Sequence, residues 1–591
     1  MNRMRRALGR TLVGVTGLAA VLATTAAFAP ASVGATTTTW VPKPMCANPA
    51  PGHKACQGVR LVKKQVPVAS TDGKRAAAIR RAISRSQLGG PAGGYTPMDL
   101  ARAYGVNADA AVGATQTVAI VDAYDDPTVR ADLNTFNAKY RLPAETAKSF
   151  RVVNQSGGTS LPAADPGWAG EITLDVQAVR GLCHRCKILL VEADNSSDQA
   201  LADAVNTAVG LGATEVTNSY GGSEDDPENT QAVAKAYDHP GVVITASSGD
   251  DGWYDWDYFN EITSVAVPPS ADTPEIPAAY PTVVGVGGTS LYLNPDSTRA
   301  SEQVWNTNGP SDAYGYSIGF PLGASGSGCS TSYDAFSWQR DLHGYGGLGC
   351  GAKRSSVDVA AVADPFTGFD DYQSWGADPQ GWGTVGGTSL SSPVIAAIWA
   401  LAGGAHGVDY PALSLYGHFN GERGKHTYDV TVGGTGACDT SSLRACYNSF
   451  GGNPNDFALG FGLIDCGFAD SGPMVLNQRW QCYAKPGYDG VAGVGTPKGV
   501  SGFTRTGPHA VIASPGIVRH RHAKRFSAAG TTDPFPGGRI TRYAWNFGDG
   551  HTATGTSPSH TYAKKGKRTI TLKVSDSYGF TAVAKRRIAV R

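Results

Sequence analysis

The sequence from 386 to 393 reads Gly386-Gly387-Thr388-Ser389-Leu390-Ser391-Ser392-Pro393, and an apolar run follows it from 394 to 402. The glycines allow the backbone to approach a ligand, and the apolar run predicts a buried helix with Pro393 in its first turn. Amides at the N-terminus of such a helix can stabilise a negative charge beside the serine. Ser389 is therefore a candidate nucleophile; the alternative is a turn that only caps a core helix.

A serine nucleophile needs a base that removes its hydroxyl proton, and no histidine lies in a suitable sequence context. His184 lies between two cysteines, and the next three histidines after Ser389 lie in loop-like sequence. The segment 170–179 instead carries Glu171 and Asp175, and its apolar positions predict a helix. Residues four apart lie on one helix face, so these carboxylates can share a proton. A solvated helix face is the alternative interpretation.

A third landmark is the stretch Ile244-Thr245-Ala246-Ser247-Ser248-Gly249-Asp250-Asp251-Gly252, which predicts a strand that runs into a Gly-Asp turn. With Ser389 and the acidic pair, this stretch resembles the sedolisin family, serine-carboxyl peptidases with a subtilisin-like fold. The resemblance covers about residues 95 to 500 in the family's order. Further matches are Pro277-Ala278-Ala279-Tyr280-Pro281, Val284-Gly285-Val286-Gly287-Gly288-Thr289, Ser356-Val357-Asp358-Val359-Ala360 and Asp364-Pro365.

The resemblance implies a role for each of these side chains. Glu171 would be the general base toward Ser389, and Asp175 would hold and tune Glu171. Asp250 would stay protonated and donate a hydrogen bond to the oxyanion. Because a carboxylate base works near its own pKa, this arrangement predicts activity at acidic rather than neutral pH.

The resemblance also implies one structural calcium (Ca2+) site. Two tight turns after the serine helix, at 428–431 and 484–490, contain carboxylates and glycine, and oxygen ligands of this kind suit a hard cation. An Asx turn at each aspartate is the alternative. The family pattern places the ion among Asp429, Val430, Lys485, Gly487 and Asp489.

Outside these landmarks, short apolar strands alternate with amphipathic helices. Strands are predicted at 117–122, 188–192 and 215–219, and helices at 127–140 and 198–211. This alternation predicts an α/β fold, a subtilisin-like parallel sheet with helices on both faces, in a domain from 93 to 507. Asp122 resembles the triad aspartate of subtilisins, but without a histidine motif we interpret it as a structural or cleft residue.

The first 92 residues predict export and processing. Residues 1–35 have the arginines, the apolar stretch and the small residues of a signal peptide. Residues 36–92, with ten basic residues and one acid, are interpreted as a short basic prosegment of a zymogen. The body from 95 to 507 carries 21 basic and 45 acidic residues, so we expect the prosegment to dock over the cleft by charge. Falling pH should loosen it, and cleavage is expected before about Tyr95.

Ten cysteines in an exported chain favour disulfide bonds over thiol catalysis. Short-range pairing is expected for Cys46 with Cys56, Cys183 with Cys186, and Cys329 with Cys350. The remaining cysteines cannot be paired from the sequence; they are Cys438, Cys446, Cys466 and Cys482.

Residues 508–591 form a separate module. The stretch Tyr543-Ala544-Trp545-Asn546-Phe547-Gly548-Asp549-Gly550 and the alternating run 568–576 resemble the polycystic-kidney-disease-type (PKD) β-sandwich. With 15 basic and three acidic residues, the module predicts binding to anionic cell-surface or polymer partners, the alternative being a spacer. No base-reading motif accompanies this charge, so nucleic acid is not an expected partner.

Together, these features predict a secreted, monomeric serine-carboxyl peptidase that hydrolyses peptide bonds in proteins and peptides through an acyl-enzyme on Ser389, without membrane insertion. Two other classes remain open. One is a catalytically silent surface-binding protein, and the other is a neutral subtilisin-like protease that uses Asp122 with an unrecognised histidine. The sequence does not separate endopeptidase from tripeptidyl-peptidase action.

Overall fold

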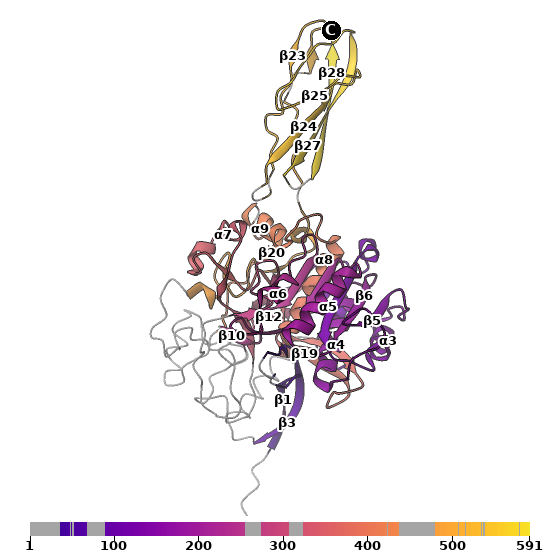
Figure 1. Cartoon of the computed structure of the whole chain (residues 1–591), viewed down its shortest axis with the longest axis vertical. Coiled ribbons are helices and arrows are strands. Elements are labelled where there is room, and N and C mark those ends of the chain that lie inside the picture. Colours follow the sequence, from indigo (N-terminus) through magenta and orange to yellow (C-terminus); the bar gives the residue numbers. More distant parts are fainter. Residues whose placement is uncertain are drawn as a thin grey trace, which may run out of the picture.

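The computed structural model describes residues 36–67 (without 48, 50 and 51), 89–253, 274–306, 323–435 (without 422) and 479–591 (without 506, 514–515, 534, 536–537 and 578–579). The predicted signal peptide lies outside the described residues, as do Cys438, Cys446 and Cys466. Figure 1 shows a layered α/β body and a slender β-domain that projects from it and carries the C-terminus. Within the described ranges, no helix has both the length and the apolar character needed to cross a bilayer.

An eight-stranded sheet forms the centre of the described body. Its strands follow the order β13-β12-β9-β7-β4-β6-β5, and β17 also pairs with β12. All described pairs are parallel except that of β12 with β13. The predicted parallel sheet is therefore confirmed. The strands are β4 (Thr117–Ala123), β5 (Phe150–Asn154), β6 (Lys187–Ala193), β7 (Glu215–Asn218), β9 (Val243–Ser247), β12 (Val284–Leu293), β13 (Arg299–Val304) and β17 (Val359–Val362).

Alternate side chains of these strands enter two separate cores because both faces of the sheet are covered. On β4, Val118 and Ile120 belong to the core beneath α4 (Pro166–Leu182) and α8 (Thr388–Ala402). Ala119 and Val121 belong to the opposite core, beneath α5 (Asp198–Gly210) and α6 (Gln231–Lys235). Helix α3 (Val129–Tyr140) lies on the same side as α4.

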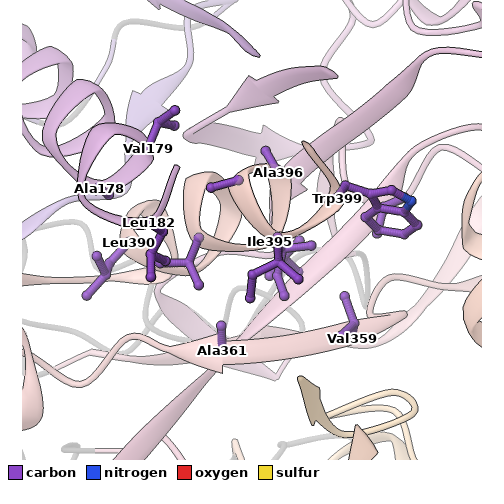
Figure 2. Close-up of a cluster of buried hydrophobic side chains, with 14 of the residues drawn as sticks. Ala178, Val179, Leu182, Val359, Ala361, Leu390, Ile395, Ala396 and Trp399 are labelled. Atoms are coloured by element: carbon purple, nitrogen blue, oxygen red, sulfur yellow. The ribbon is translucent and has the colours of Figure 1, made fainter. Parts of the chain in front are cut away.

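Helices α4 and α8, which carry candidate site residues, pack against each other and against the sheet. Figure 2 shows Val179 and Leu182 of α4, Leu390 and Ile395 of α8, and Ala361 of β17 in this buried cluster. Complete burial of a valine, leucine or isoleucine side chain stabilises the fold by about 1.5–3 kcal/mol. The two helices are therefore held rigidly relative to each other.

The helix that follows the glycines begins earlier than the apolar run predicts. It starts at Thr388, so Pro393 lies inside α8 rather than in its first turn. Proline cannot donate the bond that would reach the carbonyl four residues earlier, which belongs to Ser389. That carbonyl instead accepts a hydrogen bond from the Ser219 hydroxyl at 3.3 Å. A tertiary contact therefore replaces the missing helical bond.

The described part of the predicted prosegment forms a β-hairpin on the body. Strands β1 (Thr36–Pro44) and β3 (Val59–Pro67) pair antiparallel. Strand β3 also pairs with β19 (Gly381–Gly386), whose other neighbour is β18 (Phe369–Gln373). The hairpin thereby extends the sheet that leads into α8.

The C-terminal domain confirms the predicted β-sandwich elements. Its larger sheet has the order β22-β28-β27-β24-β25. Trp545 is 1% exposed and packs with Phe526 and Phe547 in a separate core. The strands of this sheet are β22 (Ile517–Val518), β24 (Ile540–Asn546), β25 (Thr552–Thr554), β27 (Gly566–Asp576) and β28 (Thr581–Val590).

The three short-range disulfides predicted from the sequence are confirmed. They join Cys46 to Cys56, Cys183 to Cys186, and Cys329 to Cys350. Cys482 is also disulfide-bonded.

Candidate active site

Ser389 is fully buried in the first turn of α8. Its hydroxyl donates a hydrogen bond to the Ser219 carbonyl oxygen at 3.3 Å. The two later serines of the motif have structural partners: Ser391 donates to carbonyl oxygens of β17, and Ser392 is hydrogen-bonded to Thr217. Of these three serines, only Ser389 lies beside the acidic pair.

Gly387, which precedes the helix, is required by its surroundings. Its φ of +90° favours glycine, and a Cβ there would lie 2.7 Å from the Oδ2 atom of Asp250. The glycine in the motif therefore allows Asp250 to approach the N-terminus of α8.

Glu171 and Asp175 lie one turn apart on α4, and both are completely buried. The helix begins where the Asp165 carboxylate accepts hydrogen bonds from two amides of its first turn, and Pro166 occupies N1. Residues 168–182 of α4 are all buried, which excludes the solvated helix face that the spacing alone allowed. The acidic pair faces the interior, where Ser389 also lies.

Ser219 connects the acidic pair with the serine. Its hydroxyl lies within hydrogen-bonding distance of both Asp175 oxygens, at 2.7 and 2.9 Å, and of the Ser389 carbonyl. Sequence reasoning did not single out Ser219, because a serine that follows a strand carries no distinctive signal. Its position directly after β7 was the only available hint.

The carboxyl groups in this region form one electrostatic cluster. Burial raises the pKa of Glu171 well above its usual range, and the negative charge of Asp122 raises it further. Burial also raises the pKa of Asp175, and the negative charges of Asp122 and Glu171 raise it further. Burial also raises the pKa of Asp122 to about 8. Three buried carboxyl groups so close together cannot all be ionised, so the cluster shares protons.

Ser389 lies beside Glu171 in this cluster. The Ser389 hydroxyl lowers the pKa of Glu171 through a polar contact, although this contact lacks standard hydrogen-bond geometry. Hydrogen bonds in an active site often tighten only when a substrate reacts. Glu171 is therefore placed to accept the hydroxyl proton.

Asp250 occupies the opposite side of the serine turn. Its Oδ1 atom accepts hydrogen bonds from the amide and the hydroxyl of Thr388, at 2.7 and 2.8 Å. Its Oδ2 atom is buried and has no hydrogen-bond partner among the described residues. Burial raises the pKa of Asp250 well above its usual range. A protonated Oδ2 would offer one unused hydrogen bond to a negatively charged oxygen.

The residues predicted to bind calcium also lie together. The Lys485 amide donates to Asp489, and the Gly487 amide donates to Asp429, both at 2.9 Å. The charges of the two aspartates interact, and Asp489 is completely buried. Val430, directly after Asp429, is also buried. Two carboxylates beside several backbone groups fit a hard cation.

Comparisons with known proteins match these observations. The subtilase family model matches residues 166–411, and the PKD domain model matches residues 505–590. Sedolisin of Pseudomonas sp. (strain 101) is 27% identical over 406 residues, which cover 65% of this chain and 62% of sedolisin. Kumamolisin of Bacillus sp. (strain MN-32) is 31% identical over 331 residues, which cover 54% of this chain and 53% of kumamolisin. The chain thus spans less than two thirds of the length of either relative.

A solved structure confirms the fold. Pseudomonas sedolisin, a serine-carboxyl proteinase complexed with two molecules of pseudo-iodotyrostatin, aligns with a TM-score of 0.52 and 24% identity. The alignment covers 69% of this chain and 96% of that structure. The body therefore has a subtilisin-like fold.

Proposed function

We propose that this chain, which contains a subtilase-family domain homologous to sedolisin and kumamolisin and ends in a PKD domain, is a serine-carboxyl peptidase. It would hydrolyse peptide bonds in proteins or peptides. The strongest support is that Glu171, Asp175, Asp250 and Ser389 come from three separate segments and gather around one serine turn. The test is a labelled-peptide assay on active-site variants.

Each residue has a defined chemical task in this proposal. Glu171 takes the proton of the Ser389 hydroxyl as its oxygen attacks the substrate carbonyl. Asp175 and Glu171 share a proton, and Ser219 holds Asp175 in place. The Asp250 hydroxyl and the Ser389 amide donate to the developing oxyanion. The acyl-enzyme is then hydrolysed by water with Glu171 as the base.

The other two functional classes have less support. A silent binding protein would not need three carboxyl side chains gathered around one serine. A neutral histidine-dependent protease would need a histidine in the cluster, yet among the described residues no histidine affects the pKa of Asp122, Glu171 or Asp175. We therefore favour catalysis by carboxyl groups, with activity at acidic pH.

Buried carboxyl groups should make the folded protein more stable at acidic than at neutral pH. Burial raises the pKa of Asp122 to about 8, that of Glu192 to about 9 and that of Glu215 to about 8. Their unfolded-state pKa values are about 4, so between about pH 4 and 8 the folded chain binds protons that the unfolded chain has released. The contribution of these groups to the free energy of unfolding is therefore fully present at low pH and is lost as the pH rises.

We expect a higher melting temperature at pH 5 than at pH 7.5, measured by scanning calorimetry. Glu215→Gln keeps an oxygen that can accept from the Thr214 hydroxyl but removes one titrating group. The substitution should therefore reduce the slope of the unfolding free energy against pH by up to about 1.4 kcal/mol per pH unit. Asp225→Asn, at an exposed position, should keep the wild-type dependence. A stability that rises from pH 5 to 7.5 would contradict this account.

We also propose that Asp429, Asp489 and the carbonyl oxygens of Val430, Lys485 and Gly487 hold one structural calcium ion. The fit rests on two neighbouring aspartates whose charges repel each other and on the turn at 484–490, whose backbone contacts both. When bound, the ion would neutralise this pair and join the turn after β20 (Thr427–Tyr428) to the turn at 484–490.

Removing calcium with EDTA should lower the melting temperature, because a ligand that binds only the native state contributes about 2.7 kcal/mol at 100 times its Kd. Added calcium should restore the chelated wild type but not Asp489→Ala. Asp409→Ala, at an exposed position, should retain the wild-type response. A melting temperature unaffected by either EDTA or Asp489→Ala would show that no stabilising ion binds here.

Export and surface binding complete the proposal. The signal-like first 35 residues support secretion. The PKD domain exposes basic side chains on β27, β28 and the preceding loop, which support binding to anionic surfaces. These residues are Lys564, Lys565, Lys567, Lys573, Lys585 and Arg587.

A further inference from the structure

The N-terminal hairpin inserts part of its connecting segment into the candidate active site. Strand β2 (Ala55–Cys56) pairs antiparallel with β8 (Tyr220–Ser223). The backbone amide of the next residue, Gln57, donates a hydrogen bond to the Ser219 carbonyl oxygen at 3.3 Å. An extended peptide that adds to a strand in this way is a common mode of peptide recognition.

The carbonyl group of Gln57 lies at the groups that would stabilise an oxyanion. Its oxygen accepts a hydrogen bond from the Ser389 amide at 3.3 Å. A Cβ on Gly387 would lie 2.0 Å from this oxygen and 2.7 Å from Oδ2 of Asp250. The Gln57 carbonyl and the unused Asp250 oxygen therefore border the same small space.

The other side of the same peptide bond lies at the candidate base. A Cβ on Gly58 would approach Oε2 of Glu171 to 2.3 Å, so only glycine fits without movement. The Gly58 amide also lowers the pKa of Glu171, which places the leaving nitrogen beside the group that would protonate it. The bond between Gln57 and Gly58 is thus presented as a substrate bond.

The Gln57 side chain is buried, and both ends of its amide have polar partners. Its nitrogen donates to the Glu275 carboxylate, and its oxygen lies 3.3 Å from the Thr388 hydroxyl oxygen, whose shorter hydrogen bond goes to Asp250. Gly221 and Gly249 lie against Glu275, and a Cβ at either would clash with it. Their lack of side chains leaves room for the pair formed by Gln57 and Glu275.

We propose that Gln57–Gly58 is a self-cleavage site, and that Glu275 selects a hydrogen-bond-donating side chain, such as glutamine, on the amino side of the scissile bond. This inference rests on the proposed peptidase function, because the same serine must carry out the cut. It also places a first cut well before Tyr95, where processing was expected from the sequence.

The cleavage follows from the groups already in place. The Ser389 oxygen bonds to the Gln57 carbonyl carbon while Glu171 takes the hydroxyl proton. The carbon–nitrogen bond then breaks, and the Gly58 nitrogen receives that proton to become a free amine. Water, deprotonated by Glu171, attacks the ester that joins Gln57 to Ser389, leaves a carboxylic acid at Gln57 and returns the proton to the serine. No other reactant is required.

Contacts on the amino side of the bond would retain the cut segment. The disulfide between Cys46 and Cys56 lies within the new N-terminal fragment, and β1 stays paired with β3. Lys54 also forms an ion pair with buried Asp198 at 2.9 Å. Strand pairing thus supplements the charge attraction that the basic composition predicts. The fragment should therefore remain over the site until it dissociates.

The test is the N-terminus of the purified full-length protein, determined by mass spectrometry after incubation at pH 4. We expect a new N-terminus at Gly58 in the wild type and an intact 57–58 bond in Ser389→Ala. Cleavage in both proteins would overturn self-cleavage. Hydrolysis of an unrelated labelled peptide, measured in parallel, separates the two proposals. If the wild type hydrolyses that peptide but leaves its own 57–58 bond intact, only this inference is overturned. If the wild type shows neither reaction, the proposed peptidase function is overturned as well.

The selectivity of Glu275 is tested with added peptides in the same assay. The peptides Lys-Ala-Ser-Gln-Gly-Val-Arg and Lys-Ala-Ser-Glu-Gly-Val-Arg differ only at the residue before the scissile bond. At pH 6 the wild type should prefer the glutamine peptide by at least about tenfold in kcat/KM, because the glutamate carboxylate would face Glu275. Glu275→Gln should reduce this preference to within about threefold. Equal wild-type rates on the two peptides would overturn the assignment of Glu275.

Discussion

Replacing Glu171 with Gln should lower kcat on a labelled peptide by at least about 1000-fold, since removing a member of a serine triad costs on this scale. Glutamine has nearly the same shape, but it cannot take the Ser389 proton. The loss should persist at every pH from 3 to 8, because among the described residues no histidine acts on this cluster that could replace the base. Steady-state kinetics across this range are the measurement.

Glu215→Gln is the matched control for this substitution. Glu215 is also a completely buried glutamate, but it lies at the start of β7, whereas Ser219 and the reacting groups lie beyond the end of that strand. Its kcat should stay within about twofold of wild type. If Glu171→Gln kept wild-type kcat, the acidic pair would be a structural feature of α4 and not a catalytic one.

Replacing Asp250 with Ala should lower kcat by about 100- to 1000-fold, the cost of losing one oxyanion donor. Asp250→Asn should lose less, because its side-chain amide can still donate toward the oxyanion. The two variants should also differ in pH dependence. Wild-type activity should fall when Asp250 loses its proton, whereas the Asn variant should not show this decline.

Melting curves are the control, since Asp250 also accepts two hydrogen bonds from Thr388. An Asn variant as inactive as the Ala variant, with both folded, would contradict the role of Asp250 as a donor. The carboxyl group would then be needed in its charged form.

Local patterns in the sequence were sufficient to predict much of this site. The spacing of Glu171 and Asp175 follows from helical periodicity, and the glycines before Ser389 indicate a close backbone approach. The structure confirms that α4 is a helix and buries both carboxylates. Alternating strands and helices likewise predicted the parallel sheet, because each apolar run is short and continuous.

Contacts between distant segments could not be predicted in this way. Ser219 is 170 residues from Ser389, and Gln57 is 331 residues from Thr388. Nothing local in the sequence indicates that these residues meet. The internal position of Pro393 has the same explanation, because its tolerance depends on the bond from Ser219 to the freed Ser389 carbonyl.

In the predicted prosegment, composition alone gives an incomplete account of how the segment contacts the body. Its positive charge predicted docking on an acidic body, and the ion pairs of Lys54 with Asp198 and of Arg60 with Asp371 agree with this attraction. Strand pairing of β3 with β19 and of β2 with β8 adds a contribution that does not depend on charge. Backbone hydrogen bonds leave no compositional signal, so the substrate-like position of Gln57 could not be predicted from the sequence.

The central claim is that Ser389 is the nucleophile of a peptidase. The most direct measurement is hydrolysis of an internally quenched peptide at pH 4 by the wild type and by Ser389→Ala, with circular dichroism to show that both are folded. We predict hydrolysis by the wild type and only the uncatalysed rate with Ser389→Ala. Hydrolysis by folded Ser389→Ala within tenfold of the wild-type rate would contradict the claim.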